Sequence, residues 1–356
     1  MNSLAPSSYR KEECLIGKTP LAIFCGTGGV GKTSLAATYA LFLVQKNPKK
    51  KILLITIDPS LRLKDFFKLP ENNPTQDFFS LSLPEIGNFD LLLLQPFYSF
   101  SKISSKTSLE KNRLVKLLMS NFGGMQEIMG MIELYNYYSS QYYDFIILDT
   151  PPGKHFLDFL NSCQKIRKFF HNKVFDLLKS FSSQKKLPIW KKILIQGPEK
   201  LLFYLEKMTG EGFLQEFLET VILIRENYQL FTNALEMENI LKDPNKTASF
   251  YVTSCKHYKA DDLEDFALKS QETLSKNSYI VLNRQESSIL FEQTRHSLPP
   301  LEMYLKYIQE KEKNISLQIQ EKFPHFSLLC FNESSWHEEI DLFIKDLLNQ
   351  WKGHLS

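Results

Sequence analysis

No two of the five cysteines in this 356-residue chain form a CxxC pair, and none is spaced from a histidine as in a zinc motif. The sequence therefore does not predict a structural zinc site. An odd number of scattered cysteines is compatible with a reducing compartment. The five positions are Cys14, Cys25, Cys163, Cys255 and Cys330.

No apolar run is long enough to span a membrane, since the longest, such as "LLLL" at 91–94, have the length of a strand. The first 20 residues also contain no apolar stretch of the kind found in signal peptides. We therefore expect a cytoplasmic protein. The net charge is +3, and the lysine clusters at 49–51 and 185–192 are typical of solvated faces. No nucleic-acid partner is expected.

Short runs of β-prone apolar residues recur along the chain. Each is apolar almost throughout rather than at alternate positions, which indicates strands covered on both faces, as in a parallel sheet. Helical patterns separate the runs, so the sequence predicts an α/β fold with a doubly wound, mostly parallel sheet. The runs lie at 21–25, 52–57, 89–95, 144–148, 249–254, 278–282 and 326–331.

Two long segments, 96–140 and about 155–246, are rich in Leu, Phe, Lys and Glu at helical spacing. We interpret them as a helical subdomain inserted into the sheet domain. The sheet domain would then consist of residues 19–95, 141–154 and 247–356, preceded by an N-terminal extension of residues 1–18. The chain also predicts an amphipathic last helix, whose stripe is better explained by core packing than by a partner surface. That stripe contains Ile340, Phe343, Ile344, Leu347 and Trp351.

The segment "GTGGVGKTS" at 26–34 fits the pattern G-x-x-x-x-G-K-[ST] between a predicted strand and a predicted helix. Its glycines allow backbone N–H groups to point inward at phosphate oxygens, and the helix adds its positive end. Lys32 would contact the β- and γ-phosphates, and the Thr33 hydroxyl would bind Mg²⁺. The predicted nucleotide-binding residues here are Gly26, Thr27, Gly28, Gly29, Val30, Gly31, Lys32, Thr33 and Ser34.

Two aspartates stand at the ends of other predicted strands. Asp149 ends "DFIILDTPP" as in a Walker B motif, where it would hold Mg²⁺ through water. Asp58 ends "ILLITIDPS" and could orient the attacking water as a catalytic residue beside Lys32. A helix N-cap or a turn is the alternative role for either aspartate. Both fall at the carboxyl ends of parallel strands, where α/β sheets bind ligands.

Together, "GTGGVGKTS", "TIDPSLRLKDFF" and "LDTPPGKHFLDFL" resemble the ArsA-type ATPases, a family of P-loop NTPases of the deviant Walker A class. The family includes arsenite-pump motors and the eukaryotic factor that delivers tail-anchored membrane proteins. The chain is most similar to the bacterial branch that often occurs as paired genes. The resemblance extends from about residue 19 to 335. It implies a dimeric ATPase that uses ATP and Mg²⁺.

The resemblance also assigns roles to residues. Asp58 falls where the family's switch I aspartate positions water, and residues 149–155 fall on switch II, which senses the γ-phosphate. The segment "FGGMQEIMGM" at 122–131 is similar to a helix that couples the nucleotide to the helical subdomain. Asn283 resembles the asparagine that reads adenine, a role that suits an amide because it can donate and accept along one base edge. A turn former is the alternative for Asn283.

The chain departs from the family pattern at three places. Thr27 stands where the family's loop usually carries a lysine that reaches the nucleotide of the partner subunit. Gly153-Lys154 replaces the common Thr-Gly of switch II, and Cys255-Lys256 replaces a Pro-Glu pair after the strand at 249–254. Thr27 would deprive the other subunit's site of a cation. That suits either a heterodimer with one weakened site or a homodimer with slow hydrolysis.

The resemblance does not identify a client. Trivalent arsenic needs converging thiolates, so the scattered cysteines argue against arsenite. Methionines at 119, 125, 129 and 131 are explained by core packing or switch coupling better than by an adaptable client groove. Three functions are compatible with these features. The first is a Mg-ATP-driven dimeric switch that opens and closes a helical surface for a protein or membrane-linked client. The second is a weakly active regulatory subunit of a heterodimer with an ArsA-like paralogue, and the third is a ParA- or MinD-like positioning ATPase. The large helical insert argues against the last.

Overall fold

The computed structural model describes residues 16–57, 62–69, 78–94, 125–151, 153, 156–161, 228–270, 274, 276–286, 299–334 and 340–354. Eight strands in these ranges form one sheet in the order β3-β4-β2-β5-β1-β6-β7-β8. Neighbouring strands are parallel, apart from the antiparallel pair β3–β4. The strands are β1 (Leu21–Gly26), β2 (Ile52–Thr56), β3 (Phe78–Leu83), β4 (Gly87–Leu93), β5 (Phe145–Asp149), β6 (Thr247–Ser254), β7 (Ser278–Gln285) and β8 (Ser327–Asn332).

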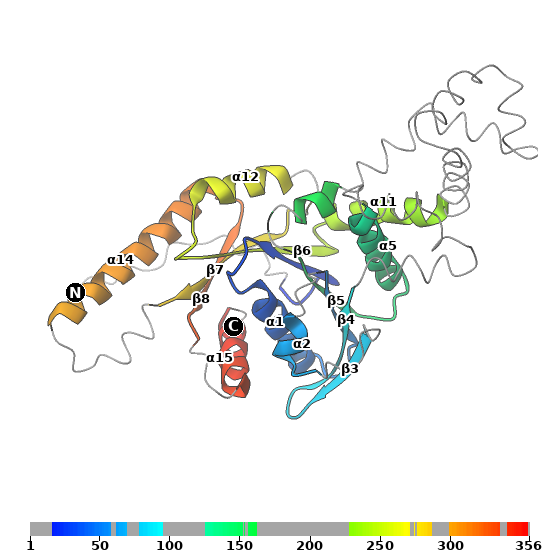
Figure 1. Cartoon of the computed structure of the whole chain (residues 1–356), viewed down its shortest axis with the longest axis horizontal. Helices are drawn as coiled ribbons and strands as arrows, with labels where there is room; N and C mark the ends of the chain where they lie inside the picture. Colours follow the sequence, from blue (N-terminus) through cyan, green and yellow to red (C-terminus); the bar gives the residue numbers. More distant parts are fainter. Residues whose placement is uncertain are drawn as a thin grey trace, which may run out of the picture.

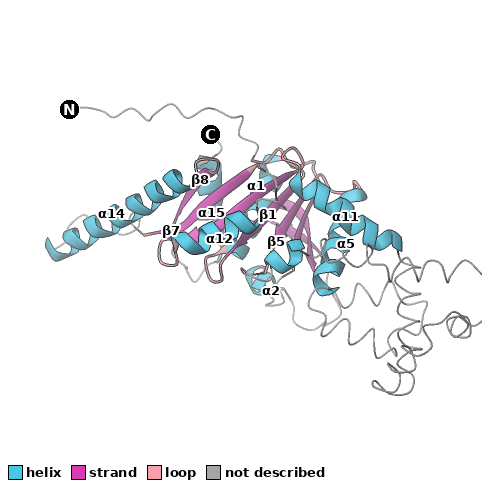
Figure 2. Cartoon of the chain, turned by 90° about the horizontal axis from the view of Figure 1, so that it is seen from above, coloured by secondary structure: helices cyan, strands magenta, loops and turns pink. Residues whose placement is uncertain are grey.

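Helices cover both faces of this sheet, as Figure 1 shows and Figure 2 repeats from above. Successive residues of β1 alternate between the two apolar layers: Ile23 belongs to one and Phe24 to the other. One layer includes α1 (Lys32–Lys46), α2 (Arg62–Phe66) and α15 (Ile340–Gly353). The other includes α5 (Met125–Ser139), α11 (Tyr228–Lys242), α12 (Ala260–Ser270) and α14 (Pro299–Lys322). The predicted α/β fold with a mostly parallel sheet is confirmed.

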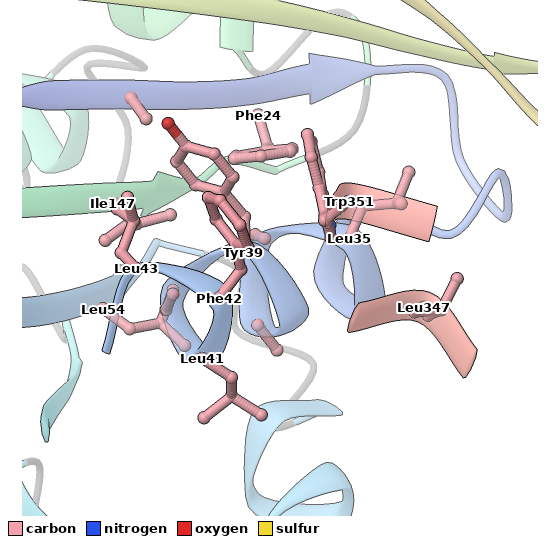
Figure 3. Packing of buried hydrophobic residues seen from close by; sticks show 14 of the residues in the cluster. Phe24, Leu35, Tyr39, Leu41, Phe42, Leu43, Leu54, Ile147, Leu347 and Trp351 are labelled. Atoms are coloured by element: carbon pink, nitrogen blue, oxygen red, sulfur yellow. The ribbon is translucent and has the colours of Figure 1, made fainter. Parts of the chain in front are cut away.

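Helix α1 is held in place by an aromatic cluster beneath β1 (Figure 3). Phe24 of β1 stacks on Phe250 of β6 with ring centroids 4.7 Å apart, and Tyr39 of α1 lies against Trp351 of α15 at 4.8 Å. The Trp351 Nε1–H donates to Thr38 Oγ1 over 3.2 Å. The last helix therefore packs into the core through Ile344, Leu347 and Trp351 of its predicted apolar stripe, and it supports the helix that follows the glycine loop. The side chain of Ile340 lies outside the described residues.

The edge strand β3 was not among the predicted strands. Its residues alternate, with Phe79 buried and Phe78 and Ser80 exposed, because this antiparallel edge packs on one face while the other faces solvent. The predicted strands are continuous apolar runs, and β3 was missed because its apolar and polar residues alternate. The turn into β4 uses Gly87 at φ 125°, which closes the hairpin.

The predicted helical subdomain is described in part. Helices α5 and α11 pack against each other, and buried Met131 and Met237 from them join the apolar layer on the sheet. Residues 96–124 and 162–227 of the two predicted segments lie outside the described ranges, as do the side chains of Met125 and Met129. The division into two subdomains stays a prediction.

The chain reverses its direction of travel across the sheet next to β1. It runs from β1 to β2 and β4, returns to β5 beside β1, and then crosses to β6 on the other side of β1. Such a switch point leaves a crevice at the carboxyl ends of the strands, where parallel α/β sheets bind ligands. The loop after β1 lies at this edge.

Candidate functional site

The loop between β1 and α1 consists of residues 27–31 and ends in the positive end of a helix. Gly31 is the N-cap of α1 in the left-handed conformation, with φ 89°. Because glycine has no side chain, nothing from this residue caps the first N–H groups of α1. The first turn of α1, which is described in full, contains no acidic residue. The helix end therefore keeps its positive potential and its free donors for an anion.

Two glycines are required by the packing of this loop. Gly26 has φ 140°, and a Cβ there would overlap the backbone carbonyl oxygen of Val252 on β6. A Cβ on Gly31 would overlap the side-chain amide of Asn283. The predicted loop thus depends on close approach of β6 and β7, strands that are more than 200 residues further along the chain.

Lys32 lies almost buried at the start of α1, with 5% of its surface exposed. Its ammonium donates to the Thr27 carbonyl oxygen over 2.7 Å, so the side chain folds back over its own loop. A buried ammonium is costly unless it has acceptors, and this carbonyl supplies one. The charge of Lys32 therefore lies against the backbone of the loop.

Asp149 is fully buried at the end of β5, where it pairs in register with Phe24 of β1 and Thr56 of β2. The Thr56 hydroxyl donates to Asp149 Oδ2 over 3.3 Å. Thr33 stands one residue after Lys32 in the first turn of α1. A carboxylate and a hydroxyl beside a phosphate loop are oxygen donors of the kind that Mg²⁺ prefers. The residues present therefore fit the ion that the loop motif implies.

The chain after Asp149 is attached to the end of β1. Buried Thr150 donates through its hydroxyl to the Phe24 carbonyl oxygen over 2.8 Å. The Gly153 N–H donates to the Gly26 carbonyl oxygen over 3.0 Å, and Gly153 has φ 48°. The predicted switch II segment is thus hydrogen-bonded directly to the first residue of the glycine loop.

Asn283 approaches the loop from β7. It is 6% exposed, and its Nδ2 donates to the Val30 carbonyl oxygen over 2.8 Å. The bond uses one of the two N–H donors of the amide. The β7–β8 register shifts between Leu282 and Gln285, and the next residue, Arg284, has φ 59°. Asn283 and Arg284 thus have no register partner on β8, whereas Asn283 still pairs with Ser254 of β6.

A cleft of about 210 Å³ runs from the start of α1 along these side chains to α15. It adjoins the loop, so a ligand whose phosphates occupy the loop would extend into it. Its lining includes Gly31, Ser34, Asn283, Arg284, Glu333 and Phe343. The sequence did not single out Arg284 or Glu333. Both could have been proposed as site residues, because they are polar and stand at the carboxyl ends of buried strands.

The structure brings together most of the predicted site: the loop 26–31, Lys32, Thr33, Ser34, Asp149 and Asn283. Asp58 lies outside the described residues, as do Lys154 and His155. Ile57, which precedes Asp58, donates its N–H to the Asp149 carbonyl oxygen over 3.1 Å. The chain therefore enters the undescribed segment beside Asp149.

The turn after β6 carries Cys255 and Lys256, the predicted departure from the family pattern. Lys256 forms an ion pair with Glu286 after β7, and this hydrogen bond raises the lysine pKa. Burial raises the pKa of the Cys255 thiol to about 12. An open groove of about 450 Å³ separates this turn from α14. Its lining includes no residue of the loop at 26–34.

Burial raises the pKa of Cys25 and Cys330 as well as that of Cys255, which disfavours the thiolate form that soft metals bind. Within the described ranges, no cluster of three or more His, Cys, Asp or Glu side chains could hold a metal ion. None of the described helices is both long and apolar enough to cross a membrane. The prediction against arsenite stays a prediction.

The contact between Gly31 and Asn283 yields a prediction about stability. Gly31→Ala should lower the free energy of unfolding by about 2 kcal/mol, because the left-handed backbone is strained and the Asn283–Val30 hydrogen bond is displaced. In an Asn283→Ala background the same substitution should cost about half as much. A double-mutant cycle by urea denaturation measures the coupling. Strictly additive costs would contradict the contact.

Comparisons with known proteins find a matching family and several relatives. The family model described as anion-transporting ATPase, ArsA_ATPase, matches residues 19–331. The chain is 27% identical to a putative arsenical pump-driving ATPase 1 of Aquifex aeolicus, over 44% of the chain and 40% of that protein. It is 24% identical to the putative arsenical pump-driving ATPase 2 of the same organism, over 66% and 75%. An ATPase ASNA1 homolog of Entamoeba histolytica is 27% identical, over 44% and 49%.

Two of these three matches span about half or less of the relative's own length. The family match covers most of the chain, and it includes the glycine loop, Asp149 and Asn283. Its boundaries agree closely with the range over which the sequence resembles the family. This chain therefore belongs to the ArsA-type family of ATPases.

Proposed function

We propose that this chain binds Mg-ATP in the loop at 26–34 and hydrolyses its β–γ phosphoanhydride bond. The observation that carries the proposal is the convergence at one sheet edge of the uncapped positive end of α1, the nearly buried Lys32 ammonium and the fully buried Asp149 carboxylate. A cation, a helix end and a carboxylate in this arrangement suit a triphosphate with a divalent ion.

Each described residue has a role in this proposal. Lys32 exchanges the Thr27 carbonyl oxygen for β- and γ-phosphate oxygens, which keeps its ammonium hydrogen-bonded throughout. Thr33 and Asp149 would hold Mg²⁺, Asp149 through water, and the ion would neutralise charge on the phosphates. Asn283 holds the loop through Val30 and has a second N–H and an oxygen for the edge of adenine.

Asp58 orients the water that attacks the γ-phosphorus. The oxygen of that water forms a bond to phosphorus while the bond to the bridging oxygen breaks, which releases ADP and inorganic phosphate. The aspartate follows β2, whose last residue, Thr56, contacts Asp149. The resemblance to the ArsA-type ATPases supports this catalytic role for Asp58 over the alternative role of a turn residue.

Hydrolysis would be coupled to the helices through switch II. Gly153 is bonded to Gly26 at the loop, and the chain continues three residues later into a helical turn at 156–161. Phe156 and Phe159 of that turn are buried in the same apolar layer as α5 and α11. Loss of the γ-phosphate would therefore shift residues in the apolar layer to which α5 and α11 belong. A protein or membrane-linked client would bind the surface that this change opens and closes.

We propose a dimer as the working unit, and Thr27 bears on whether it is a homodimer or a heterodimer. In the related ATPases that the sequence resembles, a lysine at this position reaches the partner's nucleotide. Thr27 provides a hydroxyl there instead. A heterodimer with an ArsA-like paralogue would supply the missing cation, whereas a homodimer would hydrolyse ATP slowly. A regulatory subunit with little turnover is the second candidate function, favoured by Thr27 and the Cys255-Lys256 turn.

The Asp58→Asn variant tests the enzymatic proposal. Mg-dependent release of phosphate by the purified chain should fall by about a hundredfold or more, because the water loses its orienting carboxylate. ATP binding by calorimetry should stay within about threefold of wild type, since no phosphate contact is removed. Wild-type protein that binds ATP without turnover would favour the regulatory subunit, and turnover that appears when an ArsA-like paralogue is added would establish it.

A further inference from the structure

Two charged side chains in the cleft beside the loop, Arg284 and Glu333, do not pair with each other. In the described part of the chain, neither side chain forms an ion pair or a hydrogen bond. Glu333 Oε2 is buried and has no hydrogen-bond partner there. The nearby Lys256 forms its ion pair with Glu286 and attracts Glu333 only at longer range, so it leaves this oxygen without a donor. A buried carboxylate oxygen without a donor is costly, so this arrangement needs a chemical reason.

The strand ends place these side chains. The Glu333 N–H donates to the Gln285 carbonyl oxygen over 2.7 Å, which ties the residue after β8 to the end of β7. Arg284 is in the left-handed region at φ 59°, next to the irregular β7–β8 register. Non-glycine residues held in this conformation concentrate at functional sites. Both charges are therefore held at the cleft by backbone structure.

The cleft that Arg284 and Glu333 line adjoins the phosphate loop. The position of a Cβ on Gly31 lies 3.9 Å from Arg284 Nε, so the guanidinium lies beside the loop. A carboxylate oxygen without a donor needs a ligand group that donates hydrogen bonds, which a phosphate does not bring. A ribonucleotide brings such a group, since its phosphates are followed by a ribose with two adjacent hydroxyl donors.

We propose that Glu333 accepts hydrogen bonds from the 2′- and 3′-hydroxyls of the bound nucleotide, and so makes the site selective for ribonucleotides over deoxyribonucleotides. Arg284 lies beside the loop and would add positive charge next to the phosphates. The inference rests on the proposed function, because it takes the phosphates to occupy the loop. It adds a residue that determines which sugar the site accepts.

The test compares Mg-ATP with Mg-2′-deoxy-ATP by isothermal titration calorimetry on the full chain. Wild-type protein should bind ATP about tenfold or more tightly than 2′-deoxy-ATP, since a hydrogen bond to a charged group is lost. Glu333→Ala should weaken ATP binding more than 2′-deoxy-ATP binding, because ATP loses two hydrogen bonds and 2′-deoxy-ATP only the one from its 3′-hydroxyl, so that the two affinities agree within about threefold. Glu333→Gln, which keeps the shape of the side chain, should lie between. Glu302→Gln, on the exposed start of α14, is the matched control.

Equal weakening of both nucleotides by Glu333→Ala and Glu333→Gln would overturn the inference, because it would indicate a structural role. A change in the preference for ATP over GTP, with the ribose preference intact, would place Glu333 at the base and also overturn it. Equal binding of the two sugars by wild-type protein would overturn the inference alone. Wild-type protein that binds neither nucleotide would overturn the proposed function as well.

Discussion

The Lys32→Ala variant is expected to lose ATP binding by about a hundredfold and hydrolysis below detection, because the ammonium is the cation that the loop directs at the β- and γ-phosphates. The side chain is nearly buried and already hydrogen-bonded to the loop over 2.7 Å, so it needs little reorganisation to contact a phosphate. Titration calorimetry with ATP and ADP measures the affinities, and phosphate release measures turnover.

Lys46→Ala is the matched control for that experiment. Lys46 is the last residue of the same helix, at the opposite end from the loop. Its Nζ lies 5.6 Å from the Phe42 ring centroid. Its removal should leave ATP binding unchanged. Thermal unfolding of both variants separates folding from binding. If Lys32→Ala remains folded and binds ATP as tightly as wild type, the loop does not hold the triphosphate as proposed.

The Gly26→Ala variant should be the most destabilising single substitution in the loop. A methyl group there would overlap the Val252 carbonyl oxygen, which belongs to the backbone of the neighbouring central strand and cannot rotate away. The φ of 140° is also strained for alanine. We expect a loss of about 4 kcal/mol or more in the free energy of unfolding, which urea denaturation measures.

Gly29→Ala tests whether this loss comes from the steric contact or from backbone conformation alone. Gly29 has φ 76°, but a Cβ there would meet no atom within 4 Å. This variant should lose only about 1 kcal/mol. Similar losses for the two variants would contradict the close approach of β1 and β6 that the structure shows. A small loss for Gly26→Ala would contradict it as well.

The sequence allowed the central sheet and the phosphate loop to be predicted because both signals are local. Strands such as β1 and β2 are buried along their whole length and therefore have nearly continuous apolar sequences. The helix α1 ends at Lys46, immediately before Asn47-Pro48, because a proline cannot continue a helix. The edge strand β3 was missed because its signal is alternation over six residues, which the search for continuous runs does not detect.

The contacts around the loop could not be predicted, because they depend on register between distant strands. The Asn283–Val30 hydrogen bond joins residues 253 positions apart. Arg284 reaches the cleft only because the β7–β8 register shifts beside it, and nothing in the local sequence encodes that shift. The Gly153–Gly26 bond likewise follows from the parallel pairing of β1 and β5. Residue types at strand ends indicated the edge of the sheet, but not which side chains meet there.

The central claim, that the loop after β1 is an ATP site, is tested most directly by calorimetric titration of wild-type protein with ATP in the presence and absence of Mg²⁺. We expect one ATP to bind per chain, with an affinity that strengthens when Mg²⁺ is present, because Thr33 and buried Asp149 would hold the ion beside the loop. A loop of this type would be saturated at about millimolar nucleotide. If no heat of ATP binding is measured at that concentration, and ADP does not compete with ATP, the loop after β1 is not an ATP site.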